Sequence, residues 1–271
     1  MDIALSGAVR QSLLSLANTQ SLIDRTNNRL ASGLKVASVT DDADAFFEAK
    51  ALTDRAQDMA DKKDGIDQGI SSLSAALEAI EAVDAVVSQM KGLANTARSA
   101  TGSELTDLVT QFNSLRGQIN SMTGDGTYQG LNLINGTGST LEVSFSNLTT
   151  SKLSVASVDL TNATGGLDIS AAANFSVGTN IDNAVTELDA AISTLRGQAQ
   201  TLGSNVALLQ TRLDFTQSYV TVLEEGSGKL TLADINEEGA NLVALQTRQQ
   251  LGISSLAFAG QSEQSVLALF R

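Results

Sequence analysis

The residues of this chain that could do chemistry are few, and the first of them form part of a phosphate-binding pattern. Gly226-Ser227-Gly228-Lys229 has the closing half of the loop in which backbone N–H groups and a lysine hold phosphate oxygens. The full pattern needs glycine where Leu223 stands, and serine or threonine where Leu230 stands. We therefore interpret the segment as a flexible break between helices rather than as a nucleotide site.

Two clusters of carboxylates are the other candidates. Asp41, Asp42 and Asp44 could hold a hard cation, and the adjacent Glu224 and Glu225 could exchange protons with a substrate. The first cluster lacks the glycine and the later glutamate that a calcium loop requires, whereas acidic residues suit the start of a helix. The sequence predicts capping for the first cluster and solvated helix-end charges for the second.

Composition removes most other catalytic and metal chemistry. The chain has no histidine, cysteine or tryptophan, so it lacks an imidazole base, a thiolate, a disulfide and the usual ligands of zinc, haem and iron–sulfur clusters. We expect no catalytic residue, no metal and no cofactor. A net charge of −13 argues against a nucleic-acid partner. No apolar run approaches the ~18–20 residues of a membrane span, so we expect no membrane insertion.

The elements that carry these residues are mainly helical. Proline is absent from all 271 residues, which favours long uninterrupted helices. The first helix is predicted over residues 5–30, with Gly33 as its end. Its apolar positions recur at alternating spacings of four and three, which is a heptad seam, and two amides on that seam would fix register. The predicted seam is Val9, Leu13, Leu16, Gln20, Ile23, Asn27 and Leu30.

Four further helices follow the same reasoning. We predict them from about residue 42 to 101, over 105–122, over 181–223 as an unbroken heptad stripe, and over 233–270. The apolar face of the last helix is Leu242, Leu245, Gln249, Ile253, Leu256, Gly260, Leu267 and Phe270.

A small β region interrupts the helices between about residues 124 and 180. Glycine, asparagine, threonine and serine dominate there, and apolar residues alternate at Leu141, Val143 and Phe145 and again at Leu153 and Val155. The fold class predicted is mainly α, a long antiparallel coiled coil or helix bundle of the N- and C-terminal segments with a small β-hairpin region in the middle.

The charges are sorted along the chain. Residues 1–40 carry a net +2 and residues 233–271 a net −2, so the segment between them carries the whole −13. An assembly that buries both ends and exposes its middle to water accounts for this pattern, whereas a monomer does not require it.

Five segments of the chain can be compared with known motifs: residues 29–36 (RLASGLKV), 41–43 (DDA), 128–134 (YQGLNLI), 240–252 (ANLVALQTRQQLG) and 264–269 (QSVLAL). In this order they resemble stretches of bacterial flagellin. The resemblance covers almost the whole chain, and the short middle leaves no room for large outer domains.

The resemblance implies a structural subunit that polymerises helically into the hollow flagellar filament for swimming. It implies that residues 1–40 with 233–271 form an inner tube and that residues 41–232 form an outer helical shell. The implied partners are other copies of the chain, the flagellar export apparatus, an export chaperone, and the filament cap and junction proteins. The implied location is the extracellular flagellum, and the N-terminus shows no cleavable signal peptide.

Many members of that family are detected by a vertebrate innate receptor through a patch on the second helix. Residues 88–93 align with it: Leu93 matches, Lys91 is a conservative change, and Gln89 replaces the family's arginine. An arginine makes forked, charge-assisted contacts that a neutral amide does not. We therefore interpret Gln89, Lys91 and Leu93 as a degenerate receptor patch.

Three other functions compete with a filament subunit. A hook–filament junction protein shares the terminal helices, a secreted coiled-coil adhesin or binding module shares the heptads, and an enzyme is disfavoured by the missing residue types. The match at residues 240–252 and the small outer region favour the filament subunit.

Overall fold

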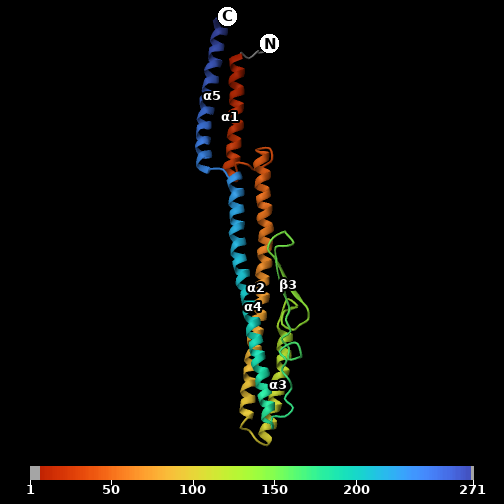
Figure 1. Ribbon diagram of the computed structural model, residues 1–271. Coiled ribbons are helices and arrows are strands. Elements are labelled where there is room, and N and C mark those ends of the chain that lie inside the picture. Colours follow the sequence, from red (N-terminus) through yellow and green to blue (C-terminus); the bar gives the residue numbers. More distant parts are fainter. Residues whose placement is uncertain (1–6, 270–271) are drawn as a thin grey trace. The chain divides into compact units, whose positions relative to one another are not determined.

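The computed structural model describes residues 7–269 and contains five helices and two pairs of strands (Figure 1). The helices are α1 (Gly7–Ser32), α2 (Ala43–Ala97), α3 (Ser103–Asp125), α4 (Gly178–Thr231) and α5 (Ile235–Leu269). The strands are β1 (Thr127–Tyr128), β2 (Leu131–Asn132), β3 (Thr140–Ser144) and β4 (Lys152–Ala156). The predicted fold class, mainly helical with a small β region, is confirmed.

The chain divides into two compact units, which are described separately. The central unit is Ala56–Thr221, and the terminal unit combines Met1–Arg55 with Val222–Arg271. The helices α2 and α4 contribute to both units.

In the central unit, α2 and α4 are antiparallel neighbours in one continuous register. Three side-chain contacts align them: Lys63 with Gln217, Lys91 with Asp189, and Arg98, the residue after α2, with Asp182. The two residue numbers of each pair add to the same total, so the register holds along the unit. Beneath these polar contacts lies an apolar core shared with α3. Its largest fully buried members on the three helices are Phe112, Ile66, Leu73, Ile80, Met90, Ile119, Leu188, Leu195 and Leu209.

The hairpin β3–β4 closes this core. Its strands pair antiparallel, from Thr140 opposite Ala156 to Ser144 opposite Lys152, so both predicted strands are confirmed. Val143 and Val155 point inward, and Val143 packs against Gly69 of α2. The short pair β1–β2 was not predicted, because two-residue strands give no period to detect.

The loop after the hairpin is fastened to α3 by side chains that bond its backbone. Asn113 donates to Ala172 O at 2.8 Å and accepts from Ala172 N at 3.0 Å, and Arg116 Nε donates to Ile169 O at 2.6 Å. Phe175 packs edge-on against Phe112 at 5.3 Å. These bonds satisfy backbone groups of a long irregular segment, as burial requires.

In the terminal unit, α1 and α5 pack antiparallel, and the residues after α1 pair with those before α5. Lys35 N donates to Thr231 O at 2.7 Å, and Ala233 N donates to Gly33 O at 2.9 Å. Gly33, at φ 70°, ends α1 in the left-handed conformation that glycine adopts at low cost.

The predicted break at Gly226-Ser227-Gly228 is wrong, because α4 continues through it to Thr231. A Cβ on Gly226 would lie 3.3 Å from Leu52 Cδ1, so this glycine permits close approach of α2 instead of ending a helix. The actual break follows Thr231, and α5 begins after Asp234, whose Oδ1 accepts from Asn236 N at 2.8 Å.

Candidate assembly surface

The α1–α5 pair contains most of the residues expected to carry assembly. One column of the predicted α1 seam faces inward: Val9 and Ile23 are buried, and Leu16 and Leu30 are half-buried. The second inward column was missed. It contains Thr19 and Thr26, which are only 4% and 6% exposed.

Hydroxyl residues occupy that column because a helix can satisfy them internally. Thr19 Oγ1 donates to Ser15 O at 2.8 Å, which leaves the threonine methyl group free to pack. The only sequence signal was the seven-residue spacing of Ser12, Thr19 and Thr26.

The column predicted in its place, Leu13, Gln20 and Asn27, is exposed in the single chain. These three side chains flank the packed stripe instead of filling it. Leu13 is 41% exposed, which leaves an apolar side chain at the edge of the pair.

On α5, the half-buried face contains Leu242, Leu245, Gln249 and Leu256, as expected. Ile253 is 52% exposed, and Gly252 faces α1 in its place, where a Cβ would lie 3.2 Å from Leu16 Cδ1. The side chain of Leu267, and the whole of Phe270, lie outside the described residues.

Polar contacts set the alignment of the two helices. Gln249 Nε2 donates to Gln20 Oε1 at 2.7 Å, and Gln20 Nε2 donates to Asp24 Oδ1 at 2.8 Å. Near the C-terminal end of α1 and the N-terminal end of α5, Arg29 Nη1 lies 2.8 Å from Oε1 of Glu238, with side-chain exposures of 27% and 11%. The charge-assisted bond at this partly buried position fixes the register more strongly than an exposed pair would.

Large apolar side chains remain uncovered on the same two helices. Leu14 is 64% exposed on α1, and Val243, Leu251 and Phe258 are 63%, 67% and 70% exposed on α5. Leu251 and Phe258 are seven residues apart and so share one face of α5, and large apolar side chains grouped on one exposed face are typical of an interaction surface.

The carboxylate clusters and the glycine-rich segment named from the sequence either form local hydrogen bonds or lie along a helix. Asp41 accepts hydrogen bonds from Ala37 N at 3.1 Å, Ser38 N at 2.9 Å and the Ser38 hydroxyl at 3.0 Å, and these bonds lower the pKa of its carboxyl group, the Ser38 hydroxyl most. Asp42 Oδ1 accepts from Ala45 N at 3.0 Å and so caps α2, as predicted. Glu224, Glu225 and Lys229 lie along α4, where no glycine-rich loop forms.

Within residues 7–269, no group of three or more acidic side chains is arranged to hold a metal ion. None of the helices in that range is both long and apolar enough to span a bilayer.

The residues of the receptor patch lie on α2 in the central unit. Gln89 is exposed, Leu93 packs against the core, and Lys91 Nζ is 2.5 Å from Asp189 Oδ1 of α4. The remaining cation of the patch therefore already has an anionic partner within the chain.

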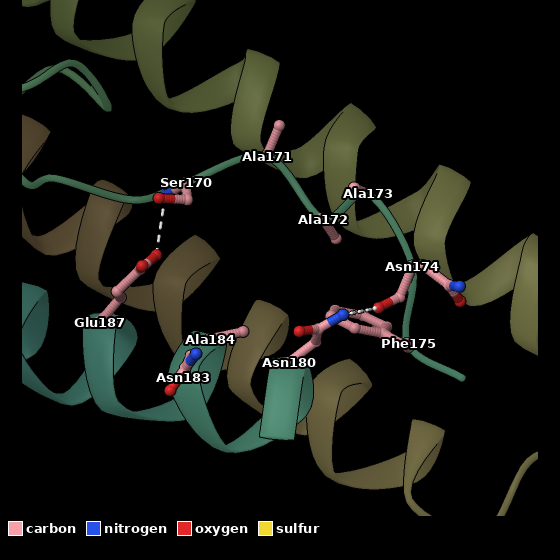
Figure 2. Close-up of a pocket in the computed structure, with 10 residues that line it drawn as sticks. All are labelled: Ser170, Ala171, Ala172, Ala173, Asn174, Phe175, Asn180, Asn183, Ala184 and Glu187. Carbon is pink, nitrogen blue, oxygen red and sulfur yellow. Dashed lines mark hydrogen bonds between the residues drawn. The ribbon is translucent and has the colours of Figure 1, made fainter. Parts of the chain in front are cut away.

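A small pocket of about 220 Å³ lies where the loop 170–175 meets the start of α4 (Figure 2). Ser170 N donates to Glu187 Oε2 at 2.8 Å, and Asn180 Nδ2 donates to Asn174 O at 2.9 Å, so the polar side chains of α4 turn toward the loop backbone. The remaining lining is mostly alanine and asparagine. The arrangement fastens a loop, and it contains no pairing of a nucleophile with a base.

The comparisons with family models and with known proteins point to the same family. The model of the bacterial flagellin N-terminal helical region matches residues 6–139, and that of the C-terminal helical region matches residues 179–270. Flagellin FljM of Caulobacter vibrioides is 31% identical over 262 residues, covering 96% of this chain and 94% of the relative. A flagellin of Brucella melitensis is 29% identical over 279 residues, covering 100% of this chain and 99% of the relative.

A solved structure described as a flagellar hook-associated protein from Vibrio parahaemolyticus has a TM-score of 0.61. It is 14% identical and covers 71% of this chain and 100% of that one, which shows a shared fold alone.

Proposed function

Because the chain belongs to the bacterial flagellin family and is a structural subunit of the flagellar filament, we propose that its α1–α5 pair is the surface through which copies assemble. The observation that carries this proposal is the set of large apolar side chains that the pair leaves uncovered, above all Leu251 and Phe258.

The energetic reason is the burial that one chain does not supply. Packing α1 on α5 covers one stripe of each helix, while five large apolar side chains among the described residues stay more than 60% exposed. Burying each such side chain is worth about 1.5–3 kcal/mol, so contact with neighbouring copies gains a large free energy. Contacts between two different faces of a subunit do not close, and they generate open helical filaments.

Charge supports the same surface. The net +2 of residues 1–40 cancels the net −2 of residues 233–271, so close packing of these segments from many copies meets little net repulsion. The proposed organisation is an inner tube of residues 1–40 and 233–271 within a shell of residues 41–232. The boundaries at residues 40/41 and 232/233 are supported by helix ends close to them, at Gly33 and after Thr231.

The proposed role includes export and delivery partners: the flagellar export apparatus, a chaperone, and the cap and junction proteins, with export to the cell exterior without a cleaved signal peptide. A chain without cysteine or proline suits passage in an unfolded state, since it forms no disulfide and needs no slow prolyl isomerisation on folding. The proposed role is structural and not catalytic.

Seeded assembly of purified protein tests the proposal. Leu14→Ser and Leu251→Ser should raise the concentration needed for filament growth on seeds by tenfold or more, since each removes an apolar contact of about 1.5 kcal/mol or more. The control is Leu148→Ser, which changes a leucine 70% exposed at the turn of the hairpin. Growth of both α1 and α5 variants at the wild-type concentration would contradict the proposal.

The junction-protein alternative predicts a different outcome. Such a subunit occupies a single ring, so wild-type protein would bind seeds without extending them. Long filaments seen by electron microscopy favour the filament subunit, and N-terminal sequencing of secreted protein tests export without cleavage.

A further inference from the structure

The chain contains a single Asn-Gly dipeptide, Asn135-Gly136, in the loop between β2 and β3 of the central unit. In such a pair the backbone nitrogen of the glycine can attack the side-chain amide carbon of the asparagine. Glycine favours this reaction because it has no Cβ to shield its nitrogen and because its backbone adopts the conformations that a small ring requires. Asn135 is therefore the asparagine of this sequence most prone to spontaneous deamidation.

The reaction needs no enzyme and no reactant other than water. The Gly136 nitrogen forms a bond to Cγ of Asn135, and the bond from Cγ to the side-chain nitrogen breaks. That nitrogen leaves as ammonia, with the proton of the Gly136 amide. Water then opens the resulting succinimide ring. Opening at the side-chain carbonyl carbon gives aspartate, and opening at the backbone carbonyl carbon gives isoaspartate, whose backbone is longer by one carbon atom.

In the folded chain, hydrogen bonds hold both reacting groups. The Gly136 N–H donates to Val158 O at 3.1 Å, so the attacking nitrogen is fixed and its proton is engaged. The Asn135 amide oxygen accepts from Thr137 N at 3.2 Å and from the Thr137 hydroxyl at 2.8 Å, which holds the side-chain amide in one orientation. The nitrogen can attack only after its bond to Val158 has broken.

Pairing of the loop with residues 158–160 adds a second restraint. Asn135 and Asp159 form an antiparallel bridge, and Leu160 N donates to Ile134 O at 2.9 Å beside it. A succinimide ring fixes the backbone ψ angle of the asparagine far from the extended value of a paired strand, so ring closure requires this pairing to open. Ile134 and Leu160 are each only 1% exposed, so opening the pair also disturbs the core.

We propose that Asn135-Gly136 is a site of spontaneous covalent modification that is open in the unfolded chain and closed by the fold. A reaction that requires local opening is slowed in proportion to the fraction of molecules that are open. The proposal concerns a covalent change within one chain, so it is independent of the assembly of copies.

The products disturb the fold where residues 133–136 pair with residues 158–160. Aspartate at position 135 places a carboxylate opposite Asp159, and like charges directly opposite each other in an antiparallel pair are destabilising. Space there is small, since even a Cβ on Gly136 would meet Asp159 Cβ at 2.7 Å. Isoaspartate lengthens the backbone and so shifts the donors and acceptors of the loop out of register. A chain that reacts while unfolded therefore folds to a less stable central unit.

Peptide mapping of the full-length monomer by mass spectrometry tests the proposal. Samples are kept at one temperature and one mildly alkaline pH, with or without guanidinium chloride. Conversion of Asn135 to aspartate and isoaspartate, which chromatography separates, should be at least about tenfold faster in the denatured sample. Equal rates in the two samples would overturn the closure of the site by the fold.

Two comparisons within the denatured state, where folding has no part, test the assignment of the site. Asn147, which is followed by Leu148, should convert at least about tenfold more slowly than Asn135, because a leucine side chain shields the attacking nitrogen. The substitution Gly136→Ala should slow the conversion of Asn135 for the same reason. Conversion of Asn135 at the rate of Asn147, or unchanged conversion in the Gly136→Ala variant, would overturn the assignment.

A substitution that reproduces the change of charge tests the effect of the product on the fold. Asn135→Asp should unfold at a lower urea concentration than the natural chain, and adding Asp159→Asn should recover most of the difference. The matched control is Asp159→Asn alone, whose amide oxygen can still accept from Thr161 N, as Asp159 Oδ1 does at 2.9 Å. Equal unfolding midpoints for the natural chain and the Asn135→Asp variant would contradict the proposed cost of the product.

Discussion

Val143 of the hairpin lies directly over Gly69 of α2. A Cβ placed on Gly69 would meet Val143 Cγ2 at 2.5 Å and Leu209 Cδ1 at 3.3 Å. The glycine is therefore the site where β3 reaches the helix surface, and its lack of a side chain decides how deeply the hairpin sits.

We predict that Gly69→Ala destabilises the central unit by about 1–3 kcal/mol, the usual cost of overpacking. The usual gain from replacing a helical glycine, about 1 kcal/mol, does not offset the clash, because a valine is held stiffly at χ1 and has little freedom to move aside. Chemical denaturation followed by circular dichroism measures the change.

The control is Gly65→Ala, one turn earlier on the same helix, where an added Cβ meets nothing within 4 Å. This substitution should stabilise the protein by about 0.5–1 kcal/mol. Equal effects at the two positions would show that Val143 does not rest on Gly69.

The stability of the turn at Ala37 and Ser38, which Asp41 holds by hydrogen bonds, should depend on pH. Its hydrogen bonds from Ser38 and Ala37 hold the pKa of its carboxyl group below the ordinary value of 3.8. A lowered folded-state pKa adds stability at pH values above the unfolded pKa, and this stability is lost as the pH falls through the folded pKa. The Ser38 amide resonance in NMR should therefore shift only in strongly acidic solution.

The matched variant is Ser38→Ala, which removes the hydroxyl that lowers the Asp41 pKa most. The titration should then move upward toward the ordinary aspartate range. An unchanged midpoint would show that the hydroxyl bond does not act on the carboxylate.

The receptor patch should be weakly active. Gln89 lacks the charged guanidinium group with which an arginine makes paired hydrogen bonds, and Lys91 is already paired with Asp189 of α4. We expect purified monomer to give low signalling in cells that report the vertebrate innate receptor, and Gln89→Arg to raise it severalfold. Strong signalling by the natural chain would contradict the interpretation of Gln89, Lys91 and Leu93 as degenerate.

Asn27 should affect the filament but not the fold of one chain. The amide is exposed on α1, so Asn27→Leu should leave monomer stability within about 0.5 kcal/mol, the usual range for surface positions. If Asn27 sets register between copies, filaments of this variant should differ in helical shape by electron microscopy. Asn95→Leu, at an exposed amide of α2, is the control, and identical filaments from both variants would remove Asn27 from the interface.

Resistance to proteolysis should differ along the chain. The terminal helices depend on neighbouring copies in the proposal, so brief digestion of monomer should trim both ends and leave a resistant middle fragment. Polymerised protein should lose that sensitivity, and mass spectrometry of the fragments locates the cleavage sites. Resistant ends in the monomer would argue against the proposed dependence.

The sequence by itself determined the helices, their order and the family. Unbroken heptads such as that of residues 181–223 specify a helix and one of its faces, and Asp42 and Gly33 mark ends through local backbone chemistry. These features depend on residues close together in the chain, which is why periodicity and capping reveal them.

Only the tertiary structure decided which neighbouring column of a heptad is buried and how the helices align. Ser12, Thr19 and Thr26 fit the helix period as well as Leu13, Gln20 and Asn27 do, and the choice follows from the partner helix. Heptad stripes also match after a shift of seven residues, so contacts far apart in sequence, such as Arg29 with Glu238 and Lys91 with Asp189, are needed to fix a single register. Gly226 was misread for the same reason, since a glycine that ends a helix and one that admits Leu52 of another helix look alike in sequence.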